Sequence, residues 1–354
     1  MTLAALVERW AGGEDTATEV ARAVRALSVP ATIALAAQLR AGRGLDHRFQ
    51  GLRRTSTLPN LELGALLSMH RNGYLRATGL AALLQTGDPF ALRFLVLRLD
   101  DIVEATRERA REALWDRLDR NAVDELIQLL PLLRATASRQ RGGASGILRD
   151  AQRYLSRNAF GRVAEAALVG ARPVRREAVA LLFADPVRAL PILQEALGDR
   201  DPAVARQVAI FATIATAPVR DVLLPLLEVS RDPAIRRRAV LTRAHERHPY
   251  VERALTDPRA SVRFTARAKL PGRARAACLA ALADPARLVG ALGGLAELGD
   301  RADAAHALPF ATHPDARIRA EAIRCLARLA PEEHADVLRA AAGDLSARVR
   351  REAQ

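Results

Sequence analysis

The sequence predicts an all-α fold made of stacked helical hairpins, about eleven to twelve of them along the 354 residues. A motif of the form Asp-Pro-x-x-x-(Val/Ile)-Arg-x-x-Ala recurs at a spacing of about thirty residues, which is typical of a stack of similar units. Apolar residues between these motifs follow the helical period, and the alternation typical of β-strands is missing. Each hairpin can bury its apolar face only against the next hairpin.

The apolar position after each turn marks the register of the repeat. It falls at Leu75, Thr106, Val174, Val204, Ile235, Val262, Val289, Ile318 and Val349. Neighbouring marks lie 27 to 31 residues apart, except for Thr106 and Val174, which are separated by 68 residues. That gap is about twice the repeat length, so we expect a degenerate repeat near residue 140.

The first seventy residues lack the clean motif. We expect a first pair of helices over residues 15–28 and 30–41, whereas residues 45–58 show no clear pattern. Terminal repeats are usually atypical, because one face of the end unit meets water. Residues 1–70 are therefore predicted to form an N-terminal cap of atypical helical repeats.

Regular repeats are expected over residues 71–137 and 147–354, with a truncated last repeat. Between them, residues 138–146 read Ser-Arg-Gln-Arg-Gly-Gly-Ala-Ser-Gly and are predicted to be a flexible loop within the degenerate repeat. Glycines can cradle a phosphate, but the Gly-Lys-Ser/Thr that completes a P-loop does not follow them.

Aspartate and proline are expected to start the second helix of each hairpin. Asp accepts hydrogen bonds from free helix amides, and Pro fits the first helical position because no donor is needed there. Asp257 and Asp284 lie five residues before their register marks. Asp201 and Asp232 lie two residues closer, which predicts a slightly different turn.

The clearest second helix is expected near the end of the chain. One helical face carries Ile318, Ala322, Cys325, Leu326 and Leu329. Pro331 is expected to end this helix, and a new amphipathic stretch follows over residues 332–341.

The turn and the repeat length resemble those of the HEAT-like repeat family, in particular the short bacterial repeats also found in chromophore lyases of light-harvesting complexes. The resemblance covers roughly residues 70–354 and implies a right-handed superhelical α-solenoid. In that family the arginine after the mark pairs with a turn Asp of an adjacent repeat. The ladder implied here consists of Arg76, Arg107, Arg175, Arg236, Arg263, Arg319 and Arg350. Ala205 and Gly290 interrupt it.

Basic residues outnumber acidic ones by 54 to 40, and the net charge is +14. Lys269 is the only lysine, which is typical of a genome-wide preference for arginine rather than of one selected surface. The excess lies in residues 134–176 and 231–275, which form either a positive stripe that follows a phosphate backbone or a set of solvated helix faces. The candidate stripe consists of Arg139, Arg141, Arg149, Arg153, Arg157, Arg236, Arg237 and Arg238.

Several other protein classes find little support. Cys278 and Cys325 are the only cysteines and lie in apolar helical stretches, so no disulfide framework is expected. Neither a signal peptide nor a membrane-spanning run of about eighteen apolar residues is found. His245 and His248 are three residues apart, whereas the zinc-binding helix of proteases needs a spacing of four. We therefore expect a soluble cytoplasmic protein without a metal or a cofactor.

One segment points to an enzymatic alternative. Residues 115–119, Trp-Asp-Arg-Leu-Asp, are similar to a segment of the bacterial alkylpurine DNA glycosylases built from HEAT-like repeats. In those enzymes an aromatic ring and an Asp one turn later flank the damaged base in a basic groove. The resemblance implies a cation–π contact from Trp115 and stabilisation of developing positive charge by Asp119.

Repeated scaffold positions account for most of the conspicuous residues. The sequence therefore favours a non-enzymatic scaffold or adaptor that binds a macromolecule, most readily a protein, on its concave surface. The alternative is a solenoid that binds nucleic acid, with or without glycosylase activity at Trp115 and Asp119. Only the shared repeat supports a chromophore lyase. The partner and the oligomeric state are left open.

Overall fold

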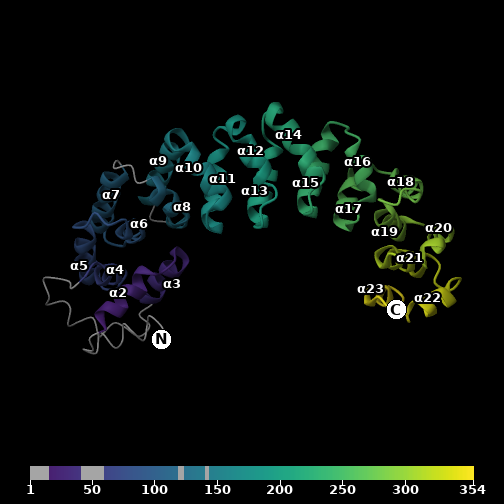
Figure 1. Cartoon of the computed structure of the whole chain (residues 1–354), viewed down its shortest axis with the longest axis horizontal. Helices are drawn as coiled ribbons and strands as arrows, with labels where there is room; N and C mark the ends of the chain where they lie inside the picture. Colours follow the sequence, from purple (N-terminus) through teal and green to yellow (C-terminus); the bar gives the residue numbers. More distant parts are fainter. Residues whose placement is uncertain (1–15, 41–59, 119–122, 140–142) are drawn as a thin grey trace. The chain divides into compact units, whose positions relative to one another are not determined.

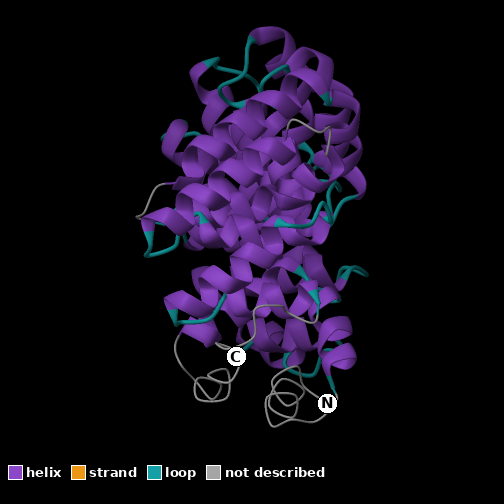
Figure 2. Ribbon diagram, turned by 90° about the vertical axis from the view of Figure 1, so that its left-hand side faces the viewer, coloured by secondary structure: helices purple, strands orange, loops and turns teal. Residues whose placement is uncertain are grey.

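The structure is a computed structural model, and it describes residues 16–40, 60–118, 123–139 and 143–354. Every regular element in these four ranges is a helix, and none is a β-strand (Figure 2). The prediction of an all-α fold is therefore confirmed. The chain separates into two compact units, residues 1–185 and residues 186–354.

The first unit is a series of helical hairpins. Its helices are α2 (Ala17–Arg25), α3 (Val29–Arg40), α4 (Leu61–Ser68), α5 (Gly73–Leu84), α6 (Leu92–Arg98), α7 (Glu104–Leu118), α8 (Val123–Ala137), α9 (Gly143–Asn158), α10 (Phe160–Val169) and α11 (Arg172–Leu182), with a short 3-10 helix, η2 (Pro89–Ala91), before α6. The first helices α4, α6, α8 and α10 contact one another in order, and so do the second helices α5, α7, α9 and α11.

The second unit continues the same pattern. Its helices are α12 (Pro186–Ala196), α13 (Pro202–Ala212), α14 (Ala217–Glu228), α15 (Pro233–His245), α16 (Tyr250–Arg253), α17 (Ala260–Lys269), α18 (Ala274–Ala281), α19 (Leu288–Leu298), α20 (Ala304–Ala307), α21 (Ala316–Leu329), α22 (Ala335–Ala341) and α23 (Ala347–Glu352), and its 3-10 helices are η3 (Ala254–Thr256), η4 (Arg301–Asp303) and η5 (Leu308–Phe310). The second helices α13, α15, α17, α19, α21 and α23 contact one another in order and form the second-helix row (Figure 1).

The segment near residue 140, where a degenerate repeat is expected, holds the helices α8 and α9, which pack against each other. The predicted loop over 138–146 is wrong at its C-terminal end, because α9 begins at Gly143 and residues 143–146 form its first turn. Residues 140–142 lie outside the described part of the chain. Helix formation here is driven by burial, since Ala144, Ile147 and Leu148 are all buried.

The N-terminal part also follows its prediction in outline. The first predicted pair of helices corresponds to α2 and α3, and residues 45–58 lie outside the described part. The expected boundary at residue 70 falls inside a hairpin, because α4 already begins at Leu61 and pairs with α5. The regular repeats therefore start earlier than the motif alone indicated. Among the described helices, none is both long and apolar enough to cross a membrane.

The two kinds of turn predicted from the Asp positions are both found. The Asp201 carboxylate accepts a hydrogen bond from the Ala203 amide at 3.0 Å, and α13 begins directly after it at Pro202. The Asp257 carboxylate accepts one from the Arg259 amide at 2.8 Å, but α17 begins only at Ala260. The residues between Asp257 and Ala260 form an Asx-type turn before α17.

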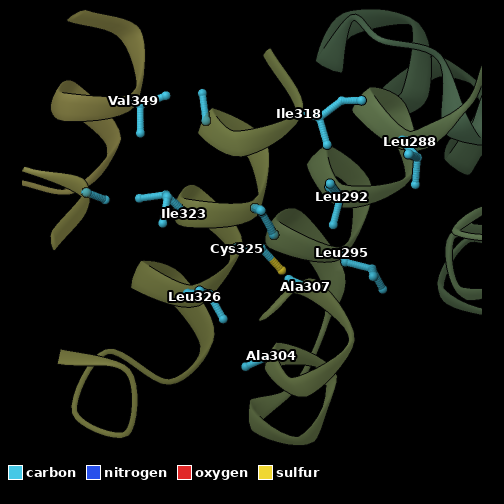
Figure 3. Packing of buried hydrophobic residues seen from close by; sticks show 14 of the residues in the cluster. Leu288, Leu292, Leu295, Ala304, Ala307, Ile318, Ile323, Cys325, Leu326 and Val349 are labelled. Carbon is cyan, nitrogen blue, oxygen red and sulfur yellow. The ribbon is translucent and has the colours of Figure 1, made fainter. Parts of the chain in front are cut away.

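The apolar core runs between neighbouring hairpins. Figure 3 shows this for α21, whose side chains meet α19 and α20 on one side and α23 on the other. Ile318, Cys325 and Leu326 of the predicted apolar face are buried, and α21 ends at Leu329 before Pro331, as expected. Burial of one such aliphatic side chain contributes about 1.5–3 kcal/mol, which the isolated hairpin cannot obtain.

Candidate binding surface

Three arginines of the predicted ladder join neighbouring hairpins in the same way. The pairs are Arg76 with Asp101, Arg236 with Asp257 and Arg319 with Asp344. In each pair Nε and Nη2 donate to the two carboxylate oxygens over distances of 2.7–2.9 Å. The third nitrogen, Nη1, donates to backbone carbonyls in the turn of the arginine's own hairpin. One guanidinium therefore closes one turn and binds the next turn.

The other ladder arginines also close the turns of their own hairpins. Arg107, Arg175 and Arg350 donate Nη1 to turn carbonyls of their own hairpins, at 2.8, 2.7 and 2.6 Å. Arg263 does the same to the Asp257 carbonyl at 2.7 Å, and its remaining nitrogens bind the Glu297 carboxylate of the next hairpin. These side chains hold turns together, which accounts for their recurrence without a ligand.

The two interruptions of the ladder have separate structural causes. A side chain at Gly290 would place its Cβ 1.7 Å from the carbonyl oxygen of Thr256, so α19 lies directly against η3. Ala205 is buried, and its neighbour Arg206 instead donates Nε to the turn residue Asp232 at 2.7 Å. At Ala205 a side-chain link between hairpins is thus kept through Arg206, whereas at Gly290 backbone packing replaces it.

The candidate basic stripe divides into two groups. In the first unit, Arg149, Arg153 and Arg157 are exposed and follow one face of α9 at intervals of four residues. Arg153 pairs with Asp150 of the same helix at 2.9 Å. Arg139 approaches Asp100 at 3.4 Å, and Arg141 lies outside the described residues.

The second group lies in the second unit, on α15. Arg236 binds Asp257 and its own turn, which corresponds to its place in the ladder; its place in the basic stripe stays a prediction. Arg237 is exposed and donates Nε to the Thr265 hydroxyl at 3.2 Å, while Arg238 is half-buried.

Trp115 of the glycosylase-like segment lies on α7 and is 40% exposed. The helix α7 contacts α9, so Trp115 and the α9 arginines belong to neighbouring second helices. Asp119 lies outside the described residues.

A surface that sequence reasoning missed follows the second-helix row. Each middle helix of this row contacts the preceding helix, the following helix and its own first helix. The residues of α13, α15, α17, α19 and α21 that remain exposed make up the second-helix face. Large apolar side chains are exposed on it or at the ends of its helices: Ile210, Ile214, Leu241, Phe264 and Leu298.

Phe264 and Leu298 frame a hollow at one end of this face. The hollow has a volume of about 480 Å³, and Ala268 and Leu270 also line it. Phe264 is 66% exposed, and the Arg267 guanidinium carbon lies 5.8 Å from the centre of its ring. The stacked arginine holds the ring in place while leaving most of the ring accessible.

Several arginines of the second-helix row are neutralised by carboxylates. Arg267 and Arg263 both bind Glu297, and Arg324 pairs with Glu321, which also binds Arg348. Burial alone would raise the pKa of Glu297, but the hydrogen bonds and charges of its two arginines lower it overall. Glu297 is therefore ionised at neutral pH, and the face carries less positive charge than the composition suggests.

Neither metal-binding geometry nor comparison with known proteins gives a further indication of function. Within the described ranges, no group of three or more His, Cys, Asp or Glu side chains is arranged to hold a metal ion. His245 ends α15, and His248 follows Arg247, whose φ of 51° turns the chain away from the helix. No protein-family model matches the chain, and no characterised protein matches it in sequence.

Proposed function

We propose that this chain is a non-enzymatic, HEAT-like α-solenoid scaffold of the cytoplasm, which binds a protein partner through its second-helix face. The observation that carries the proposal is the exposure of Ile210, Leu241 and Phe264 on three successive second helices. Contacts between hairpins do not need these side chains. An exposed apolar row of this kind is typical of a surface that another molecule covers.

The composition of the face favours a protein over a nucleic acid. Protein interfaces combine aromatic and aliphatic anchors with arginines, whereas nucleic-acid interfaces need unpaired positive charge. Arg206 and Arg267 are already paired with Asp232 and Glu297. A partner that covers Ile210, Leu241 and Phe264 would gain about 1.5–3 kcal/mol per side chain from burial.

The test is a triple variant, Ile210→Ser, Leu241→Ser and Phe264→Ser. Tagged wild-type and variant chains are expressed in the native cells, the proteins that copurify are identified, and the dissociation constant of the purified partner is measured. We expect the triple variant to bind the partner at least about a hundredfold more weakly, because the central apolar anchors of an interface contribute most of its energy.

The matched control is Val187→Ser, Val222→Ser and Val229→Ser. Val187 and Val222 are exposed on α12 and α14, and Val229 is exposed directly after α14, so the control removes apolar surface from the first-helix layer instead. The control should keep the wild-type affinity. Equal binding by both triple variants would refute the proposed face.

A second candidate, nucleic-acid binding with or without base excision, is favoured by one arrangement in the first unit. An exposed Trp115 on α7 neighbours the helix that presents Arg149, Arg153 and Arg157. Aromatic rings and arginines together bind unstacked bases and phosphates. Release of alkylated bases by the purified chain, lost in both Trp115→Ala and Asp119→Ala, would support the enzymatic form of this candidate. Release that survives both substitutions would exclude these residues as its site.

A further inference from the structure

A hollow opens in the first-helix layer where the repeats are shortest. The marks Ile235, Val262 and Val289 are 27 residues apart, whereas the other neighbouring marks of the second unit are 29 or 31 apart. Both first helices here are short, since α16 has four residues and α18 has eight, compared with eleven in α12 and twelve in α14. A hollow of about 710 Å³ is left between α16 and α18.

Small residues keep this hollow open. One wall is formed by Ala276, Ala277 and Ala280 of α18, which present only methyl groups. Gly272, with a φ of 79°, turns the chain at the rim in a conformation that other residues rarely adopt. The volume lies within the range of about 300–1,000 Å³ that is typical of small-molecule sites.

Three arginines from three separate segments line the hollow, together with one carboxylate. Arg253 comes from α16, Arg273 from the turn before α18, and Arg287 from the turn before α19. Glu252 pairs with Arg273 and supplies the carboxylate. Positive charge therefore exceeds negative charge on the walls of the hollow, in contrast to the neutralised second-helix face.

Arg253 and Arg287 keep donors free for a ligand. The Arg287 Nε donates to the Thr256 hydroxyl at 2.9 Å, and the described residues form no ion pair with its guanidinium. The Arg253 guanidinium carbon lies 5.7 Å from the centre of the Tyr250 ring, which orients it.

A carboxylate contacts one nitrogen of Arg253. The Glu228 Oε2 atom lies 3.6 Å from its Nη2, while the Oε1 atom of the same carboxylate lies 2.8 Å from the Arg243 Nε. The Tyr250 hydroxyl donates to the Glu228 carbonyl at 3.3 Å, so the aromatic support of Arg253 is itself fixed.

We propose that this hollow binds a small phosphate-bearing anion between Arg253 and Arg287. The planar guanidinium group binds phosphate through two parallel N–H donors, and two such groups in one hollow suit a di- or triphosphate better than a single carboxylate. The alanine wall leaves room for the apolar part of such a ligand. This site is separate from the second-helix face and does not depend on the function proposed for it.

Isothermal titration calorimetry of the full chain with inorganic pyrophosphate and with ATP tests the proposal. We expect saturable binding of pyrophosphate at physiological ionic strength, weakened about tenfold by Arg253→Gln and by Arg287→Gln and more strongly by the double variant. Ala276→Leu fills the hollow without a change of charge. It should weaken ATP more than pyrophosphate if the nucleoside also occupies the hollow, and both equally if only the phosphates bind. Unchanged affinity for both probes in this variant would contradict binding in the hollow.

Arg339→Gln is the matched control. Arg339 is an exposed arginine of the same layer on α22, paired only with Asp336 of its own helix, so this variant loses the same charge elsewhere. Its affinity should stay at the wild-type value. Absence of saturable binding of both probes would overturn the proposal, and so would an equal loss in Arg339→Gln and Arg253→Gln. Far-ultraviolet circular dichroism of each variant confirms that it is folded.

Discussion

Arg236 and Asp257 lie on successive hairpins and are joined by two parallel hydrogen bonds of 2.7 and 2.8 Å. The same arginine donates to the Ser230 carbonyl at 2.7 Å, so it binds its own turn as well. Hydrogen bonding to Asp257, the largest effect, raises the pKa of Arg236. Both partners are nearly buried, which makes this link stronger than an exposed ion pair.

Asp257→Asn should therefore destabilise the second unit by about 2–4 kcal/mol, because it removes the carboxylate that pairs with the nearly buried Arg236 charge. The midpoint of urea unfolding measures the effect. The control is Asp336→Asn, which removes an ion pair whose two side chains are almost fully exposed. That change should cost no more than about 0.5 kcal/mol. Equal losses in the two variants would contradict a structural function of the ladder.

Gly290→Ala should be among the most damaging single-methyl additions in the chain. The new Cβ would lie 1.7 Å from the Thr256 carbonyl oxygen and 2.4 Å from its carbon, so α19 has to move away from η3. We expect a loss of more than about 3 kcal/mol or failure to fold, measured by thermal unfolding.

Gly161→Ala provides the comparison. It adds the same methyl group within α10, where no atom lies within 4 Å of the new Cβ. This variant should be stabilised by up to about 1 kcal/mol, because alanine restricts the unfolded chain. A tolerated Gly290→Ala would show that the close approach of α19 to η3 is not needed.

Stability should decrease in acid. Burial alone would raise the pKa of Asp101, but hydrogen bonds from Arg76 and from the Val103 amide, with the charge of Arg98, lower it overall. Asp344 is shifted in the same direction, mainly by Arg319. A carboxylate with a lowered pKa stabilises the fold above its unfolded pKa, near 3.8, and this contribution is lost as the pH falls through the folded value.

The melting temperature should therefore vary little through these two groups between neutral pH and about pH 5, and then fall steeply below about pH 4. Asp101→Asn should lower it at neutral pH and reduce the steepness of the acid limb. A melting curve whose pH dependence is unchanged in Asp101→Asn would contradict this assignment.

Both cysteines should be inert in the folded chain. Burial raises the pKa of Cys278 to about 11 and that of Cys325 to about 12, and both side chains are fully buried. Since the thiolate is the reactive form, iodoacetamide at neutral pH should label neither residue until urea is added. Mass spectrometry measures the extent of labelling. Fast labelling of the native chain would show that the hairpins carrying α18 and α21 open locally.

The α9 arginines allow a direct test of nucleic-acid binding. If α9 binds a phosphate backbone, the triple variant Arg149→Gln, Arg153→Gln, Arg157→Gln should reduce the slope of log affinity against log salt by up to about 0.9 for each phosphate that is no longer neutralised. The measurement is fluorescence anisotropy with duplex and single-stranded DNA. An unchanged slope, or no binding by the wild type at low salt, would exclude this surface.

The hairpin order was predictable because it depends on periodic residues that pack locally. The turn Asp, the register mark and the apolar face of residues 318–329 each report on contacts within one or two hairpins. The start of α9 was not predictable in this way, since Gly143 and Gly146 disfavour a helix and only burial of Ala144 and Ile147 overrides them.

The exposed surfaces were harder to recognise. Ile210 and Leu241 each follow a register mark by six residues, and this repeated offset was a usable signal in the sequence. Phe264 sits two residues after its mark, where the exposed Arg206 and Arg237 stand in the preceding hairpins, so the apolar offset of six residues does not lead to it. Only the exposed fraction of each side chain distinguishes an exposed apolar residue from a buried one.

The glycine at position 290 also bears on how such chains are compared with one another. A search for the repeat motif depends on the arginine that follows the mark. This hairpin, which has glycine there, would match the motif poorly. In the folded chain its backbone makes the closest approach of any hairpin glycine described, to the carbonyl of Thr256. The glycine that replaces the recognisable arginine also allows the close backbone contact. A weak match to the motif is therefore a poor guide to loss of structure in this hairpin.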